Sequence, residues 1–208
     1  MSLPGLPLAL PPGQLDALRA AYAEPPRAYH DFNHVAEVLR HYATVADGPG
    51  WQQPAEVALA VLYHDAVYVA GKGDNEARSA RWARDEIARW LSGSGIDAGR
   101  VAYLVELTAR HGRHAPSDFD DDPAADDVRN FLDCDMAILG AEPDAFDAYD
   151  RAIATEYAGV LPGWLFRLNR RRFLRGLLAR DRIYLGGFFH LRLEEKARRN
   201  LRRALGKH

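Results

Sequence analysis

Two His-Asp pairs, His30-Asp31 and His64-Asp65, are the first residues in this chain whose types and spacing could do chemistry. Imidazole nitrogens and carboxylate oxygens are good ligands for divalent transition metals. With eight histidines in 208 residues, about one such pair is expected by chance, so the dipeptide alone decides nothing. The surroundings separate the two pairs, because His64-Asp65 follows the apolar run 58–63, where an ionised aspartate is costly without a partner. A shared metal ion is one possible partner, and an arginine at a helix end is the other.

A second acidic pair, Asp133 and Asp135, lies in the apolar segment 131–139. Two residues apart on a helix, the side chains point to nearly opposite sides, so only one is expected to face a shared site. The other then stabilises the helix dipole as a first-turn charge. The residues alone leave open which of the two is the ligand.

The segments that must position these residues have helical periodicity almost throughout. Asn33 is expected to cap a helix that starts at His34, and Val57–Val69 is interpreted as a buried helix, with a buried strand as the alternative. No alternating run with hairpin turns and no internal repeat is found. We predict an all-α fold, one helical domain over 1–208 with a core of about 14–160 and C-terminal helices at about 161–205. The expected helices are 14–23, 34–45, 57–69, 75–91, 99–110, 127–139, 142–160, 164–179 and 191–205.

Composition excludes several classes of protein. The net charge of −2 gives no general attraction to nucleic acid or to anionic membranes. The single cysteine, Cys134, excludes an internal disulfide and a cysteine-based zinc cluster, and it fits a reducing compartment. No stretch approaches the ~20 apolar residues of a membrane span, and the opening Met1–Pro7 lacks the basic start of a signal peptide. We therefore expect a soluble, cytoplasmic protein with no membrane or nucleic-acid partner.

Three surface features have an ordinary interpretation. The arginines of 167–182 alternate with apolar residues at helical spacing, which favours an amphipathic helix with a solvated basic face over a nucleic-acid site. The acidic run 118–122 is interpreted as a solvated loop. The aromatic cluster Tyr184, Phe188 and Phe189 fits packing within the domain or against a second copy of the chain, so a homodimer is left open.

The ordered set of motifs resembles the HD superfamily of metal-dependent phosphohydrolases, and more closely a bacterial branch of small, mostly uncharacterised HD-domain proteins. That superfamily has a histidine, a His-Asp pair some thirty residues later and a distal aspartate. The resemblance runs roughly from Leu15 to Leu205 and implies an HD-type helical bundle. Its matching segments are Tyr29–Val35, Tyr63–Tyr68, Asp74–Ala80, Thr108–His111, Leu132–Asp135 through Leu139-Gly140, Glu156-Tyr157 and Ala197–Leu201.

The resemblance implies His34, His64, Asp65 and Asp135 as four metal ligands, which favours Asp135 over Asp133. Two histidines and two carboxylates without a thiolate favour Mn²⁺, Co²⁺, Ni²⁺, Fe²⁺ or Mg²⁺ over structural zinc. Asp31 is then outside the ligand set. The implied reaction is hydrolysis of a small phosphate ester, possibly a nucleotide, by metal-activated water.

Proton transfer and substrate binding need further residues. Glu76 is our candidate catalytic base together with the ligand Asp65, although Glu76 also fits an ordinary first-turn glutamate. Arg27, Lys72, His30 and His111 are candidate substrate contacts, and His111 fits a helix-end role equally well.

The chain departs from the family pattern in one respect, because Ala152–Thr155 holds no arginine before Glu156. If that arginine holds phosphate in relatives, this chain uses another cation or another substrate. The alternative function is a metal- or nucleotide-binding module without catalysis.

Overall fold

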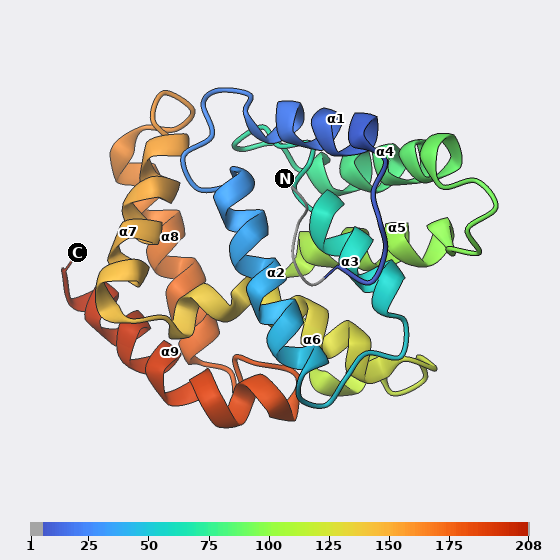
Figure 1. Cartoon of the computed structure of the whole chain (residues 1–208). Coiled ribbons are helices and arrows are strands. Elements are labelled where there is room, and N and C mark those ends of the chain that lie inside the picture. The colour runs from blue at the N-terminus through green and yellow to red at the C-terminus, as the bar shows by residue number, and fades with distance from the viewer. Residues whose placement is uncertain (1–5, 208) are drawn as a thin grey trace.

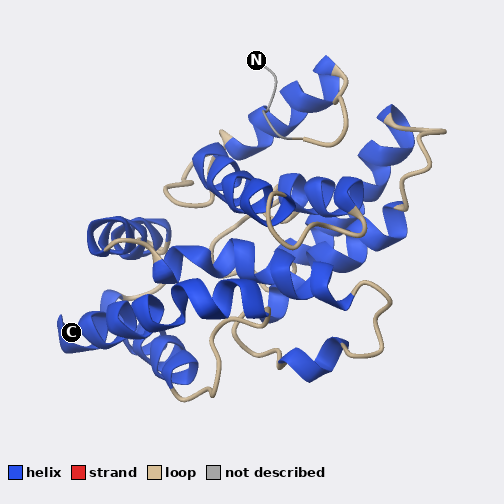
Figure 2. Ribbon diagram, turned by 60° about the horizontal axis from the view of Figure 1, so that its bottom comes forward, coloured by secondary structure: helices blue, strands red, loops and turns tan. Residues whose placement is uncertain are grey.

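The computed structural model describes residues 6–207, so the part of the opening segment before Leu6 lies outside the described residues. The described chain is helical with no strand (Figure 2), which confirms the all-α prediction. None of its helices is both long and apolar enough to span a bilayer. The α-helices are α1 Pro12–Tyr22, α2 Phe32–Ala46, α3 Pro54–Tyr63, α4 Asn75–Trp90, α5 Ala98–Leu107, α6 Ala125–Met136, α7 Pro143–Glu156, α8 Gly163–Leu178 and α9 Gly187–Lys207, with short 3-10 helices at Thr108–Arg110, Pro116–Phe119 and Ala137–Gly140.

Helix α2 runs through the middle of the molecule, between two groups of helices (Figure 1). Helices α1, α3, α4 and α5 lie on one side, and α7, α8 and α9 lie on the other. Helix α5 packs against both α3 and α4, α8 packs against α9, and α2 contacts α3 and α6. The three ends of α2, α3 and α6 that carry the candidate ligands can therefore meet near the centre.

One hydrophobic core extends over both groups of helices. It includes Leu18 of α1, Val35 of α2, Leu174 of α8 and Ala204 of α9. The C-terminal helices, which the sequence places beyond a core ending near 160, thus belong to the same core. Tyr184 and Phe189 are buried in it, so these two aromatic side chains pack within the chain.

Helix α3 is shorter than predicted: it ends at Tyr63 and not near Val69. The backbone N–H groups of Val67 and Val69 donate to the side chains of Ser79 and Asn75 in α4, both at 3.0 Å, rather than to carbonyls of their own helix. The strand alternative is wrong as well. His64 and Asp65 consequently stand at a helix end, where the chain turns and frees both side chains to face a common point.

Several other helix bounds differ from the prediction for local reasons. Helix α7 ends at Glu156, and Gly159 turns the chain with φ +83°, a conformation that other residues rarely adopt. Helix α9 begins at Gly187, four residues earlier than expected. The acidic loop is only partly solvated, since Asp122 accepts from Arg100 at 2.6 Å with both side chains largely buried.

The N-terminal cap of α2 is Asp31 and not Asn33, which corrects the prediction. Asp31 Oδ1 accepts from the backbone N–H groups of Asn33 at 2.8 Å and His34 at 3.2 Å. Asn33 instead donates its side-chain amide to Asp31 Oδ2. The aspartate of the first His-Asp pair is thus occupied in starting the helix that carries His34.

Replacing Asp31 by alanine is expected to lower the free energy of unfolding by about 1 kcal/mol, because two N–H groups of the first turn lose their acceptor. Urea unfolding followed by circular dichroism measures this change. Asn33→Ala is the matched control and is expected to cost clearly less. Equal losses in the two variants would contradict the assignment of the cap.

Candidate metal centre

Three helices bring the candidate ligands together. His34 lies in the first turn of α2, His64 directly follows α3, and Asp135 lies in the last turn of α6. Asp65 follows His64 in the chain. The two histidines are almost completely buried, with side-chain exposures of 2% and 1%, while the two aspartates remain slightly exposed. Burial of this much charge and polarity at one point requires strong mutual compensation.

The ligand atoms lie close around one point. His34 Nε2 and His64 Nε2 are 3.0 Å apart, and Asp135 Oδ1 lies 3.0 Å from the first and 3.5 Å from the second. Asp65 Oδ2 lies 3.1 Å from His64 Nε2 and 3.6 Å from His34 Nε2. Asp65 and Asp135 therefore approach the same pair of imidazole nitrogens.

This donor set fits a divalent ion. Ligand atoms bound at about 2.1 Å and at right angles to each other lie about 3.0 Å apart, close to the observed separations. Ligand atoms of His34, His64 and Asp135 all lie within 4.8 Å of one another, so this buried group could hold a metal ion. Nitrogen and carboxylate donors without a thiolate match the metals expected from the sequence.

The orientation of His64 supports the same conclusion. Its Nδ1 lies 2.8 Å from the carbonyl oxygen of Val61, which can only accept, so Nδ1 carries the proton. In the neutral ring Nε2 then presents its lone pair to the centre, and a backbone carbonyl is a common outer partner of metal-binding histidines.

The pKa shifts of His64 and Asp135 show that the carboxylates concentrate negative charge at the centre. Burial would lower the pKa of His64, but the carboxylates of Asp65 and Asp135 outweigh burial and raise it well above its usual value. Burial acts to raise the pKa of Asp135, yet His111 and His64 hold it well below its usual range. Both carboxylates therefore stay ionised and available to a cation.

Asp133 makes different contacts from Asp135, and it is not part of the group that could hold a metal ion. Its Oδ1 accepts from the backbone N–H of Leu185 at 2.8 Å, and its Oδ2 accepts from that of Gly186 at 2.7 Å. Asp133 is not a first-turn charge of its helix, because α6 begins eight residues earlier, at Ala125. It anchors the segment between α8 and α9.

His111 contacts Asp135 on the side away from His34 and His64. Its Nδ1 lies 2.9 Å from Asp135 Oδ2, the oxygen that does not face the two ligand histidines. Gly112, with φ +70°, turns the chain directly after it, and a Cβ there would lie 2.6 Å from Leu177 Cδ2. The turn therefore depends on glycine, and the imidazole fixes the direction of the carboxylate.

Replacing His111 by phenylalanine is expected to weaken the binding of Mn²⁺ about 10- to 100-fold, because the carboxylate of Asp135 loses the donor that orients it. Isothermal titration calorimetry on chelator-treated protein measures the affinity. His41→Phe, a histidine of α2 outside the centre, is the matched control and should bind Mn²⁺ like the wild type. Unchanged affinity in His111→Phe would contradict this role.

A buried glutamate, Glu156, organises the segment that carries His30. Its Oε1 accepts from the backbone N–H groups of Ala28, Tyr29 and His30 at 2.7–2.9 Å. Its Oε2 lies 2.6 Å from His30 Nδ1 and accepts from Tyr68 Oη at 3.0 Å. The sequence motif Glu156-Tyr157 marked this position, but no sequence signal assigned the contacts, which link residues 88 or more positions apart.

The Glu156 contacts place His30 beside the candidate ligands. The His30 ring stacks on Tyr68 with centroids 4.1 Å apart, and His30 Nε2 lies 4.0 Å from Asp65 Oδ2. Burial lowers the pKa of His30, but Asp65 and Glu156 together raise it above its usual value. His30 thus lies next to the centre, where two carboxylates favour the charged form of its imidazole.

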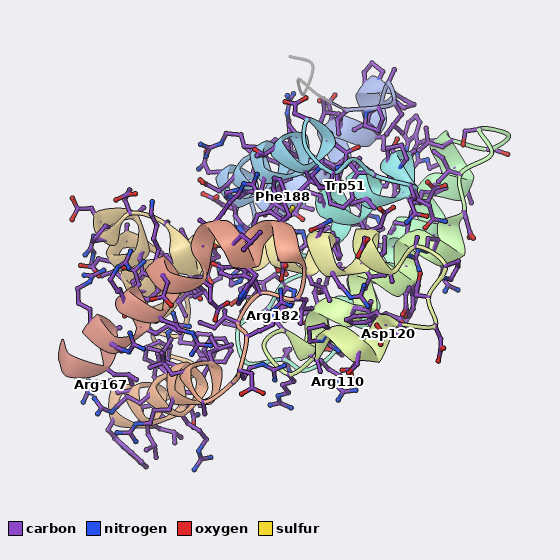
Figure 3. All side chains as sticks on the ribbon, turned by 90° about the horizontal axis from the view of Figure 1, so that it is seen from below. Trp51, Arg110, Asp120, Arg167, Arg182 and Phe188 are labelled. Atoms are coloured by element: carbon purple, nitrogen blue, oxygen red, sulfur yellow. The ribbon has the colours of Figure 1, made fainter. Side chains whose placement is uncertain are left out.

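A cavity of about 430 Å³ opens onto the centre. His30, Asp65, His111 and Asp135 line it, together with the predicted base Glu76 and the predicted substrate contact Lys72. Of the other cations near the motifs, Arg78 and Arg110 are exposed and do not belong to its walls. Figure 3 shows Arg110 at the surface.

Arg27, the remaining predicted substrate contact, is occupied within the chain. It donates to the carbonyl oxygens of His30 and Asp65 at 2.7 Å and of Ala66 at 2.9 Å. It therefore ties the His30 segment to the turn after α3, and its observed contacts position the centre instead of a substrate.

The fold and the centre define an all-α protein with a buried two-histidine, one-aspartate group that could hold a metal ion and that opens into a cavity. No known protein-family model, curated protein or solved structure matches the chain. The evidence on function is therefore the chemistry of the centre itself.

Proposed function

We propose that this protein is a divalent-metal-dependent phosphohydrolase of the HD type that acts on a small phosphate ester, with a nucleotide as one candidate. The observation that carries the proposal is the convergence of His34, His64 and Asp135 on one point at the floor of a cavity. The approach of Asp65 to both imidazoles supports it as the fourth ligand. Mn²⁺, Co²⁺, Ni²⁺, Fe²⁺ and Mg²⁺ are the candidate ions.

The residues of the cavity have separate roles in the proposed reaction. A divalent ion held by the four ligands would lower the pKa of a coordinated water molecule and screen the charge of the phosphoryl group. Glu76 is assigned to accept the proton of that water. His30 and Lys72 are assigned to bind the phosphate oxygens, and His111 holds Asp135 in its orientation.

The test combines elemental analysis of the purified protein with a screen of phosphate esters in the presence of Mn²⁺ or Co²⁺. We expect a bound transition metal and hydrolysis of at least one ester, and no hydrolysis by the double variant His64→Ala, Asp65→Ala. Glu76→Gln is expected to bind metal normally while turnover falls about 100-fold or more, as for loss of a general base.

Three outcomes would count against the proposal. Metal-loaded protein that is inactive on the whole panel would contradict catalysis, and nucleotide binding without product after long incubation would favour a non-catalytic binding module. Protein that binds no divalent ion at all would contradict the metal centre itself.

A further inference from the structure

Arg170 of α8 is a buried cation whose hydrogen-bonding capacity is only partly used. Its side chain is 9% exposed. Its Nε donates to Asp150 Oδ1 at 2.9 Å, and its Nη1 donates to Tyr149 Oη at 3.2 Å. Its Nη2 is buried and has no hydrogen-bond partner. A buried guanidinium nitrogen without an acceptor is costly, and the cost falls when a ligand supplies one.

Arg170 belongs to the walls of the cavity that contains the candidate metal centre. It also lines an adjoining cavity of about 520 Å³ between α7 and α8. The side chain of Arg170 thus borders both cavities, while its Nη2 is packed among neighbouring side chains beside them. The neighbouring Arg167, by contrast, is exposed at the outer edge of α8 (Figure 3).

A continuous series of ring contacts connects Arg170 with the metal centre. The ring of Tyr29 lies 4.6 Å from that of His34 and 4.6 Å from that of Tyr149. The guanidinium carbon of Arg170 lies 4.9 Å from the Tyr149 ring and 5.5 Å from the Phe173 ring. The cavity therefore has a metal-ligand end and a cationic end, with aromatic side chains in the wall between them.

The chemistry of the cationic end favours an oxyanion. A guanidinium matches the planar oxygen pairs of carboxylates and phosphates better than any other side chain does. Nε donates to Asp150 and Nη2 has no hydrogen-bond partner, so the ion pair between α7 and α8 leaves Nη2 to a ligand. The aromatic walls, which include Phe166 and Phe173, suit an apolar or ring-shaped body.

We propose that Arg170 binds a second oxyanion group of the substrate, a phosphate or a carboxylate, through Nη2. The substrate of the proposed hydrolysis then carries a phosphate ester at the metal end, a flat or apolar body along the aromatic wall, and a second anionic group at Arg170. The position of the phosphate ester rests on the proposed function, whereas the anion site at Arg170 does not. Arg170 thereby also supplies the cation that the segment before Glu156 lacks.

The first test measures ligand binding without any metal, so that it remains decisive if the protein hydrolyses nothing. Phenyl phosphate and benzoate are titrated into chelator-treated protein by isothermal titration calorimetry, and their relative affinities tell a phosphate site from a carboxylate site. Arg170→Gln is expected to lose about tenfold or more in affinity for the better ligand, because a charge-assisted hydrogen bond disappears. Arg175→Gln, an exposed arginine of the same helix, is the matched control and should bind like the wild type.

Two results would overturn the proposal: equal binding by Arg170→Gln and the wild type, or no binding of either ligand to the wild type at millimolar concentration. Because the glutamine variant also loses its bonds to Asp150 and Tyr149, its fold is checked by circular dichroism. If it does not fold, a crystal structure of the wild type with phenyl phosphate decides the matter. An oxyanion within hydrogen-bond distance of Nη2 is expected there, and one bound elsewhere contradicts the proposal.

The second test uses the metal-loaded enzyme and compares two kinds of substrate. Arg170→Gln is expected to raise KM about tenfold for an ester with a second anionic group, while KM and kcat for p-nitrophenyl phosphate, which has none, stay within about twofold. An equal effect on both substrates would assign Arg170 to the architecture of the cavity and overturn its role in recognition.

Discussion

Asp135→Asn is expected to weaken the binding of Mn²⁺ by about two orders of magnitude, because loss of an outer partner of a ligand alone costs about 10- to 100-fold. Asp133→Asn is expected to leave the affinity for Mn²⁺ within about threefold. Asp135 Oδ1 lies 3.0 Å from His34 Nε2, at the point where the ligand atoms converge. Asp133 uses both oxygens for the backbone of Leu185 and Gly186 and has none left for the centre. Titration calorimetry on chelator-treated protein measures both affinities.

Asp133→Asn should also lower the stability of the protein. An amide nitrogen at position 133 cannot accept from a backbone N–H group, so this variant is expected to lower the free energy of unfolding by about 1–3 kcal/mol. Asp135 pairs with His111 Nδ1 and His34 Nε2, so Asp135→Asn in chelator-treated protein loses side-chain partners but no backbone donor. Loss of metal affinity in Asp133→Asn without loss in Asp135→Asn would exchange the roles of the two aspartates.

The secondary structure could be predicted from the sequence because helical periodicity and helix-stopping residues act locally. Helical periodicity marks most elements within a few residues, and prolines mark the starts of α1, α3 and α7. The end of α3 could not be predicted, because it depends on Ser79 and Asn75, which reach back to Val67 and Val69 from the next helix. The cap of α2 was predicted two residues too late because Asp31 and Asn33 are both good capping residues.

For the candidate site, residue types and their order along the chain could predict the candidate ligands but not the contacts that support them. The order of the motifs predicts that His34, His64 and Asp135 lie close together, and in the structure these three residues could hold one ion. The supporting contacts follow from the packing of distant helices, and no local pattern encodes them. His111 behind Asp135, the carbonyl contacts of Arg27 and the free Nη2 of Arg170 are of this kind.

Among the variants proposed here, Glu156→Gln is expected to lose the most stability, about 3 kcal/mol in the free energy of unfolding at pH 7. This value follows from the lowered pKa of Glu156, because each pKa unit corresponds to about 1.36 kcal/mol. Burial acts to raise the pKa of Glu156, but the hydrogen bond and charge of His30 and the N–H groups of Tyr29 and His30 lower it to about 2. An uncharged amide loses the charged pairing with His30, and its nitrogen cannot accept from the Tyr68 hydroxyl. Because this residue holds the His30 segment beside Asp65, metal affinity should fall as well.

The pH dependence gives this prediction its sharpest form. A carboxyl whose pKa is lower in the folded state than in the unfolded state stabilises the fold fully above the unfolded value and loses that contribution as the pH falls through the folded value. For Glu156 the window runs from about pH 4.5 down to about pH 2. The difference in unfolding free energy between wild type and Glu156→Gln should therefore shrink steadily as the pH falls below about 4.5. It should also decrease as the pH rises past the usual pKa of histidine, because Glu156 contributes to the raised pKa of His30.

Urea unfolding at a series of pH values measures this difference directly. Glu142→Gln is the matched control, because Glu142 is an exposed glutamate that pairs with Lys196 at the surface. Ion pairs of that kind contribute little, so this variant should lose little stability at any pH. A difference for Glu156→Gln that does not shrink below pH 4.5 would mean that the carboxylate charge is not what holds the His30 segment. The loss in the variant would then come from hydrogen bonding, because the amide nitrogen cannot accept from the Tyr68 hydroxyl.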